Sequence, residues 1–188
     1  VELRGAQIAA DLADAERRTL LIDWNRSEYT FPLDETYAAL FAKRVAEHPE
    51  RIAAVCGNES LTYAELDQRA NRLAQALITA GGGPDTLVAL MAERGLPLLT
   101  MMIAVFKAGA AYLPLDVNHP PQRLTDILNL SRAPLLMASE KCGKLLDKVA
   151  TTAESQPAVV IAGAIWLNGD TIDLPVVGRP NDRVYVFF

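Results

Sequence analysis

The stretch from Leu96 to Asp116 constrains the fold of this chain more than any other. Its first half, Leu96–Phe106, is almost wholly apolar, which predicts a helix that is buried on all sides in a sizeable core. Pro97 suits the first turn of such a helix, and Gly109 suits the left-handed residue that commonly ends one. The residues after Gly109 predict a short buried strand that stops at Pro114. A buried helix that leads into a buried strand is typical of a βαβ unit.

Strands and helices alternate at least four times from residue 86 onward. The predicted strands cover residues 86–92, 111–113, 135–138, 159–162 and 184–188. The predicted helices cover residues 96–108, a segment that Asn118–Pro121 opens, and residues 139–149 with Ser139 as the cap. Asn168-Gly169 suggests a turn. This alternation predicts an α/β fold with a largely parallel sheet that helices cover.

The first half of the chain adds helices and a small hairpin. Amphipathic helices are predicted at residues 12–24 and 36–47, and strands at 51–56 and 60–62. Thr62 and Glu65 have the spacing of a capping box, in which each side chain bonds the backbone N–H of the other residue. The helix that follows places four apolar residues on one face, namely Leu66, Ala70, Leu73 and Leu77.

The composition argues against several classes of protein. The 188 residues carry a net charge of −5 with no basic cluster, so we expect no nucleic-acid partner. The longest apolar run is shorter than the roughly 20 residues that span a bilayer, so we expect no membrane insertion and a cytoplasmic location. Cys56 and Cys142 form no CxxC pattern, and His48 and His119 each precede a proline, so we expect no metal site.

Three segments carry a resemblance to one family. FKAGAAYLPLD at residues 106–116 resembles the second core motif of the adenylation domains of non-ribosomal peptide synthetases, which are adenylate-forming enzymes. Phe106 departs from this motif, where leucine is usual. LTYAEL at residues 61–66 is similar to the first core motif, and LLIDWNRSEYTFP at residues 20–32 to the linker that follows a condensation domain.

The resemblance implies a division of the chain and a missing loop. Residues 1–33 would be the linker between a condensation and an adenylation domain, and residues 34–188 the N-terminal portion of the adenylation core. In the family, a strand like 184–188 leads into a loop rich in Thr, Ser and Gly that holds the ATP phosphates. The sequence ends before such a loop, so we expect no catalytic, cofactor-binding or metal-binding residue here and no activity of the fragment alone.

The resemblance also implies the reaction and the partners of the parent enzyme. With ATP and magnesium, the parent would form an aminoacyl adenylate and load the amino acid onto the phosphopantetheine of a carrier domain. A condensation domain would precede the chain, and the carrier domain would follow.

Two alternatives remain at this point. The first is a fragment of an acyl-CoA or aryl-acid ligase of the same superfamily. The second is a non-catalytic platform on which a small MbtH-like protein docks at Arg132, Ala133 and Pro134, where the small Ala133 would leave room for an aromatic side chain.

Overall fold

The computed structural model describes residues 14–28, 30, 34–167, 174–175 and 177–188. The chain separates into two compact units, Val1–Leu33 and Asp34–Phe188, and each is described by itself. In the described part of the first unit, α2 (Asp14–Arg18) continues directly into a π-helical turn, η1 (Thr19–Asp23). This segment agrees with the predicted helix, whose first two residues lie outside the described residues.

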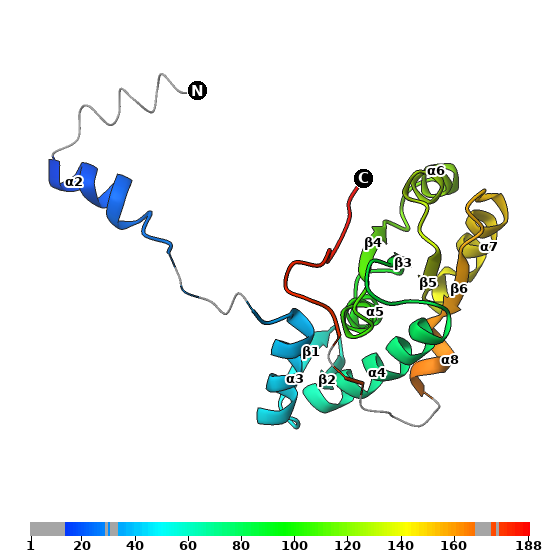
Figure 1. The fold of residues 1–188 in the computed structure, drawn as a ribbon, viewed down its shortest axis with the longest axis horizontal. Coiled ribbons are helices and arrows are strands. Elements are labelled where there is room, and N and C mark those ends of the chain that lie inside the picture. Colours follow the sequence, from blue (N-terminus) through cyan, green and yellow to red (C-terminus); the bar gives the residue numbers. More distant parts are fainter. Residues whose placement is uncertain (1–13, 29, 31–33, 168–173, 176) are drawn as a thin grey trace, which may run out of the picture. The chain divides into compact units, whose positions relative to one another are not determined.

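A four-stranded parallel sheet forms the centre of the second unit (Figure 1). Its strands are β3 (Leu87–Met91), β4 (Ala111–Leu115), β5 (Leu135–Ala138) and β6 (Ala158–Ile161). They lie in the order β4-β3-β5-β6, and all three pairs are parallel. The chain therefore moves from β3 to one side of the sheet and then crosses to the other side. The α/β fold with a parallel sheet that the sequence predicts is confirmed.

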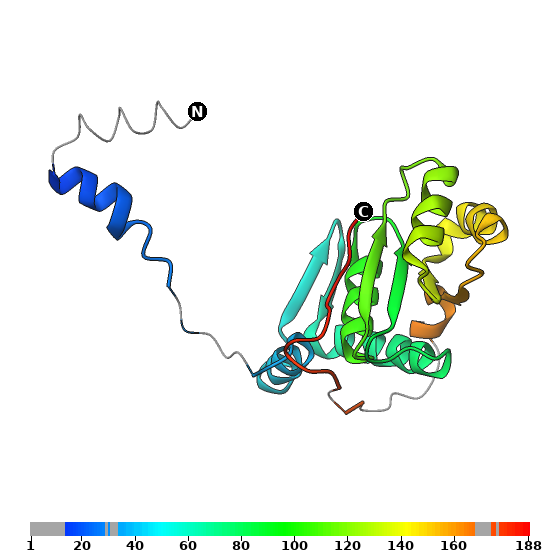
Figure 2. The ribbon, with the colours of Figure 1, turned by 45° about the horizontal axis from the view of Figure 1, so that its top comes forward.

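Helices pack on both faces of this sheet (Figure 2). The helices α4 (Tyr63–Thr79) and α5 (Leu96–Lys107) share one core cluster, to which β3 contributes Val88 and Leu90. The intervening β3 residues Ala89 and Met91 belong to a second cluster on the other face, with side chains from the next two helices. Those helices are α6 (Pro121–Ser131) and α7 (Gly143–Thr152). The alternation follows from the two-residue period of a strand, and burial on both faces explains why β3 is wholly apolar.

A helix and a hairpin complete the described fold. The helix α3 is Tyr37–Glu47, and the antiparallel strands β1 (Ile52–Cys56) and β2 (Glu59–Thr62) pair with each other. The short elements η2 (Glu140–Cys142) and α8 (Ala162–Leu167) follow β5 and β6.

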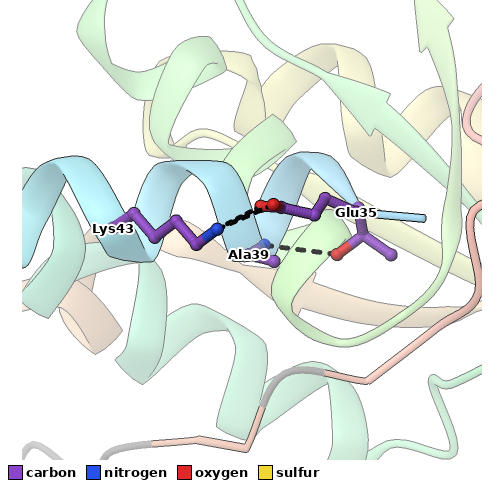
Figure 3. Close-up of polar contacts among 4 residues, drawn as sticks. Glu35, Ala39 and Lys43 are labelled. Atoms are coloured by element: carbon purple, nitrogen blue, oxygen red, sulfur yellow. Dashed lines mark hydrogen bonds and ion pairs between the residues drawn. The ribbon is translucent and has the colours of Figure 1, made fainter. Parts of the chain in front are cut away.

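The start of α3 is held by two local contacts (Figure 3). The backbone N–H of Ala39 donates to the Thr36 hydroxyl at 3.2 Å, which is an N-cap bond. The Lys43 ammonium lies 2.6 and 2.7 Å from the two carboxylate oxygens of Glu35. Because Lys43 is largely exposed, this ion pair contributes at most about 1 kcal/mol to stability.

The capping box at the start of α4 is present as predicted. The Glu65 N–H donates to the Thr62 hydroxyl at 3.2 Å, and the Thr62 N–H donates to the Glu65 carboxylate at 2.8 Å. The pKa of Glu65 is lowered, mainly because the hydrogen bond from the Thr62 N–H stabilises the charged carboxylate. A carboxyl whose pKa is lower in the folded state stabilises the fold above its unfolded pKa. This contribution is lost as the pH falls through the lowered value.

Replacing Thr62 with alanine should lower the free energy of unfolding by about 1 kcal/mol, because one N-terminal N–H of α4 loses its acceptor. Urea unfolding of the two proteins measures the difference. Thr79→Ala is a control in the same helix, since the Thr79 hydroxyl only donates to the Gln75 carbonyl. Equal stability of Thr62→Ala and the unmodified chain would contradict the assigned role of the cap.

Two predictions about the stretch from Leu96 to Asp116 need correction. Pro114 does not end its strand, because β4 continues through it to Leu115. Proline is tolerated there because β4 lies at the edge of the four-stranded sheet. Of the α5 side chains, Ile103 is buried, whereas Leu99 and Phe106 are only partly buried against the core. The helix is therefore not enclosed on every side.

Two further predictions are wrong in detail. Ser139 makes no side-chain cap bond, and its hydroxyl donates to the Cys142 sulfur at 3.3 Å. The predicted helix begins only at Gly143, after the short turn η2. Residues 184–188 form an extended segment with a single bridge, Tyr185 to Tyr112, in place of a regular strand. The predicted Asn168-Gly169 turn lies outside the described residues.

Candidate functional site

A cavity of about 540 Å³ lies where β3 and β4 end. The connection from β3 leads to α5 on one face of the sheet, whereas the connection from β4 leads to α6 on the other face. Two neighbouring parallel strands whose connections diverge in this way leave a crevice beyond their carboxyl ends. Crevices of this kind are the usual ligand sites of open α/β sheets.

Side chains from both connections line the cavity. The floor is apolar, with Leu90, Leu113, Leu115, Leu98 and Ile127 among its residues. The polar lining consists of Glu93, Arg94, Asp116, Asn118 and His119. An apolar cavity with a few convergent polar groups is the common form of a small-molecule site.

Asp116 is the best-defined polar group of this site. Its carboxylate oxygen Oδ1 accepts hydrogen bonds from the Asn118 backbone N–H at 3.0 Å and from the Asn118 side-chain amide at 2.9 Å. These two bonds lower the pKa of Asp116, with smaller contributions from the positive charges of His119 and Arg94. Asp116 therefore brings a negative charge to the cavity at neutral pH, beside a cation at Arg94.

Replacing Asn118 with alanine should raise the pKa of Asp116 toward its ordinary value, because the side-chain amide no longer stabilises the carboxylate. The backbone N–H of residue 118 remains, so the pKa should stay below the ordinary value. An NMR titration of the Asp116 carboxyl carbon measures both values. Gln122→Ala is a control, since the Gln122 amide donates to a different carboxylate, that of Asp126. An unchanged Asp116 pKa in Asn118→Ala would show that the amide contact is absent in solution.

The C-terminal segment reaches the same edge of the sheet. The Tyr112 N–H donates to the Val184 carbonyl at 3.1 Å, and the Val186 N–H donates to the Tyr112 carbonyl at 2.9 Å. The segment therefore runs parallel to β4, and its last two residues, Phe187 and Phe188, line the cavity. Figures 1 and 2 show this segment in red along β4.

The predicted partner site lies in the turn between α6 and β5, away from this cavity. Arg132 adopts a left-handed conformation with a φ of 51° and ends α6. Arg132 and Pro134 are at least partly exposed, whereas Ala133 is fully buried in the second core cluster. Neighbouring side chains therefore cover Ala133, and its contact with an aromatic side chain of a partner stays a prediction.

Sequence reasoning missed the polar residues of the cavity. Arg94 and Asp116 each follow a strand predicted from the sequence. This position after a strand could have identified them, because open α/β sheets bind ligands beyond the carboxyl ends of their strands. His119 also lines the cavity. In the described part of the chain, no group of three or more His, Cys, Asp or Glu side chains could hold a metal ion. Within those same residues, no helix is both long and apolar enough to cross a membrane.

Comparison with known proteins identifies relatives along most of the chain. Residues 41–182 match the family described as AMP-binding enzymes. The chain is 36% identical over 180 residues to tyrocidine synthase 3 of Brevibacillus parabrevis, an alignment that covers 94% of this chain and 3% of that protein. It is 38% identical over 173 residues to gramicidin S synthase 1 of Brevibacillus brevis, covering 92% of this chain and 16% of the relative. The chain thus spans a small part of the relatives it matches.

Solved structures agree with these relatives. The FmoA3 non-ribosomal peptide synthetase, bound to α-methyl-L-serine-AMP, superposes with a TM-score of 0.75 at 25% identity over 83% of this chain and 17% of its own. The N-terminal subdomain of Klebsiella oxytoca NpsA superposes with a TM-score of 0.67 at 21% identity, over 84% of this chain and 39% of its own. The second likeness shows the fold alone. The chain therefore belongs to the AMP-binding enzyme family and is of the kind found in non-ribosomal peptide synthetases.

Proposed function

We propose that this chain forms the N-terminal part of an adenylation domain that activates an amino acid with ATP. The product would be an aminoacyl adenylate, and the amino acid would pass to the phosphopantetheine thiol of a carrier domain. In this proposal, residues 1–33 are the linker from a condensation domain and residues 34–188 begin the adenylation core. Magnesium would accompany the ATP and neutralise phosphate charge in the transition state.

One observation carries the proposal. Residues 184–188 run beside β4 to the carboxyl edge of the parallel sheet and reach the cavity there. A chain that continued past Phe188 would enter the region where open α/β sheets bind nucleotide phosphates. Backbone N–H groups of a glycine-rich turn at this place would bind the phosphates.

The experiment is exchange of pyrophosphate into ATP, measured with each proteinogenic amino acid. We expect no exchange and no specific ATP binding by the 188-residue chain, because this chain lacks the proposed phosphate loop. A longer protein that includes the downstream part of the gene should show exchange with one amino acid or a few. Exchange by the 188-residue chain would place the chemistry in residues that we treat as structural.

The alternative within the superfamily is an acyl-CoA or aryl-acid ligase. The anthranilate-CoA ligase AuaEII superposes with a TM-score of 0.72 at 16% identity, a likeness of fold alone. The same exchange assay, run also with aromatic carboxylic acids, separates the two, because an aryl-acid ligase would respond to these acids and not to the proteinogenic amino acids.

A docking site for an MbtH-like protein at the turn formed by Arg132, Ala133 and Pro134 is a further part of the proposal. Because Ala133 is buried, the exposed residues around it would make the contact. One of these is Leu130, which lies two positions before Arg132 and is 70% exposed. Replacing Leu130 with glutamate should abolish co-purification of the partner without unfolding the chain. Val159→Glu on β6, which is also exposed, is the control. Retention of the partner by Leu130→Glu would move the interface elsewhere.

A further inference from the structure

Two helices of the core end in the same way, α5 at Gly109 and α4 at Gly81. The N–H of Gly109 and the N–H of the next residue donate to carbonyls three and five residues earlier in α5. The N–H groups of Gly81 and Gly82 make the same two bonds at the end of α4. The φ angles of Gly109 and Gly81 are both positive, at 74° and 94°. Both helix ends are therefore Schellman motifs closed by a left-handed glycine.

The surroundings of the two glycines differ. A Cβ atom added to Gly81 would meet no atom within 4 Å, so this position needs a glycine only for its backbone conformation. A Cβ atom added to Gly109 would lie 2.9 Å from Cγ2 of Val177 and 3.5 Å from the backbone N of Gly178. Carbon atoms in favourable contact are about 3.5 to 4.0 Å apart. The end of α5 therefore touches the chain at residues 177–178, and a side chain at residue 109 would overlap with it.

A short closed turn joins this contact at Gly109 to the segment beside β4. The Asp182 N–H donates to the Arg179 carbonyl at 3.0 Å, and the Arg179 N–H donates to the Asp182 carboxylate at 2.6 Å. Val184 follows this turn and begins the bonds to β4. Because two internal bonds hold the turn, its ends move together. A displacement of residues 177–178 would therefore be carried to Val184.

The pairing of residues 184–186 with β4 needs a second attachment point. Among the described residues, two backbone bonds join this segment to β4, and both are to Tyr112. A pairing this short specifies its register weakly, and a slip of one residue would turn every side chain of the segment to the other face. The contact at Gly109, three positions before Tyr112, supplies that second point.

We infer that Gly109 is a positioning residue, which seats residues 177–178 against the end of α5 and thereby fixes the register of residues 184–186 on β4. Val177 is branched at Cβ, so its side chain has few allowed rotamers with which to avoid a new neighbour. A methyl group at residue 109 would therefore displace the backbone of the segment. The consequence for activity rests on the proposed function, in which this segment leads into the loop that binds the ATP phosphates.

Hydrogen exchange can report the position of the segment, because neighbouring amides of β4 point in opposite directions. The Tyr112 N–H donates to the Val184 carbonyl at 3.1 Å. The Ala111 N–H donates to the Thr86 carbonyl at 2.9 Å, on the other side of β4. Release of the segment exposes the first amide and leaves the second protected. The ratio of the Tyr112 protection factor to that of Ala111 therefore measures release without global unfolding.

Native-state hydrogen exchange of the 188-residue chain tests the positioning role. In Gly109→Ala, the ratio of Tyr112 to Ala111 protection should fall at least tenfold. Gly81→Ala is the matched control, since it places the same strain of a left-handed alanine at a helix end with open space around it. This strain lowers global stability, so the ratio should not fall. An unchanged ratio in Gly109→Ala, or an equal fall in Gly81→Ala, would overturn the inference.

A second substitution tests whether the contact with Val177 is the cause. Adding Val177→Ala to Gly109→Ala removes the Cγ2 atom that the new methyl group would meet. The protection ratio should return to within about threefold of the unmodified chain. Unfolding of Gly109→Ala that Val177→Ala reverses would equally support the steric contact. A ratio that stays low in the double variant, or unfolding of both variants, would place the effect in the left-handed backbone and overturn the inference.

Pyrophosphate exchange by the longer protein tests the consequence for activity. Gly109→Ala should lower the exchange rate at least tenfold, and adding Val177→Ala should recover most of it. Gly81→Ala should keep the unmodified rate. An undiminished rate in Gly109→Ala would overturn the link between this register and the phosphate loop. Absence of exchange by the unmodified longer protein would contradict the proposed function, while the hydrogen-exchange ratios would still decide the positioning role.

Discussion

Replacing Lys107 with methionine should lower the free energy of unfolding by about 3 to 5 kcal/mol, because it leaves a carboxylate almost buried without its counter-charge. The Lys107 ammonium lies 2.8 Å from the Asp67 carboxylate, and the two side chains are only 10% and 15% exposed. The ammonium also lies 5.9 Å from the centre of the Phe41 ring. After the substitution, Asp67 would keep a hydrogen bond from the Asn71 amide at 3.0 Å. Urea unfolding monitored by circular dichroism measures the loss.

Two comparisons make this result specific. Lys43→Met removes a lysine at a similar distance from a carboxylate but on the surface, and it should cost at most about 1 kcal/mol. Adding Asp67→Asn to Lys107→Met should recover part of the lost stability, because the amide carries no charge to bury. Equal losses for Lys43→Met and Lys107→Met would show that the buried pair contributes nothing beyond a surface pair.

Replacing Leu73 with alanine should lower the free energy of unfolding by about 3 kcal/mol, since it opens a cavity between α4 and the sheet. Leu73 is fully buried in the core cluster that α4 shares with α5 and one face of the sheet. Leu130→Ala makes the same chemical change at an exposed site and should stay within about 0.5 kcal/mol of the unmodified chain. Thermal and urea unfolding should rank the two variants in the same order. A stable Leu73→Ala protein would mean that α4 does not pack as described.

Elements defined by local interactions could be predicted from the sequence. The capping box at Thr62 and Glu65 joins residues three positions apart, so its spacing alone identified it. The left-handed conformation of Gly109, with a φ of 74°, was predicted because a glycine commonly closes a helix in this way. The strands β3 and β5 are uninterrupted apolar runs, which is typical of parallel strands buried on both faces.

The sequence could not reveal which polar side chains meet. The position of Lys107 in the last turn of α5 does not indicate its partner, and the fold pairs it with Asp67 of α4, forty positions earlier. Arg94 and Asp116 follow different strands, and the parallel pairing of β3 with β4 brings them to one cavity. Ala133 looked like an open surface position because its neighbours are turn residues, but it packs in the second cluster.

The sequence by itself determined the alternation of strands and helices, the faces that they bury and the motifs that mark the family. These features depend on residue spacing within single elements, where hydrophobic periodicity and capping act over a few positions. The tertiary structure alone decided the strand order β4-β3-β5-β6, the continuation of β4 through Pro114 and the single bridge between β4 and residues 184–188. Each of these depends on hydrogen bonds and packing between residues far apart in the chain, and local preferences do not specify which distant partners meet.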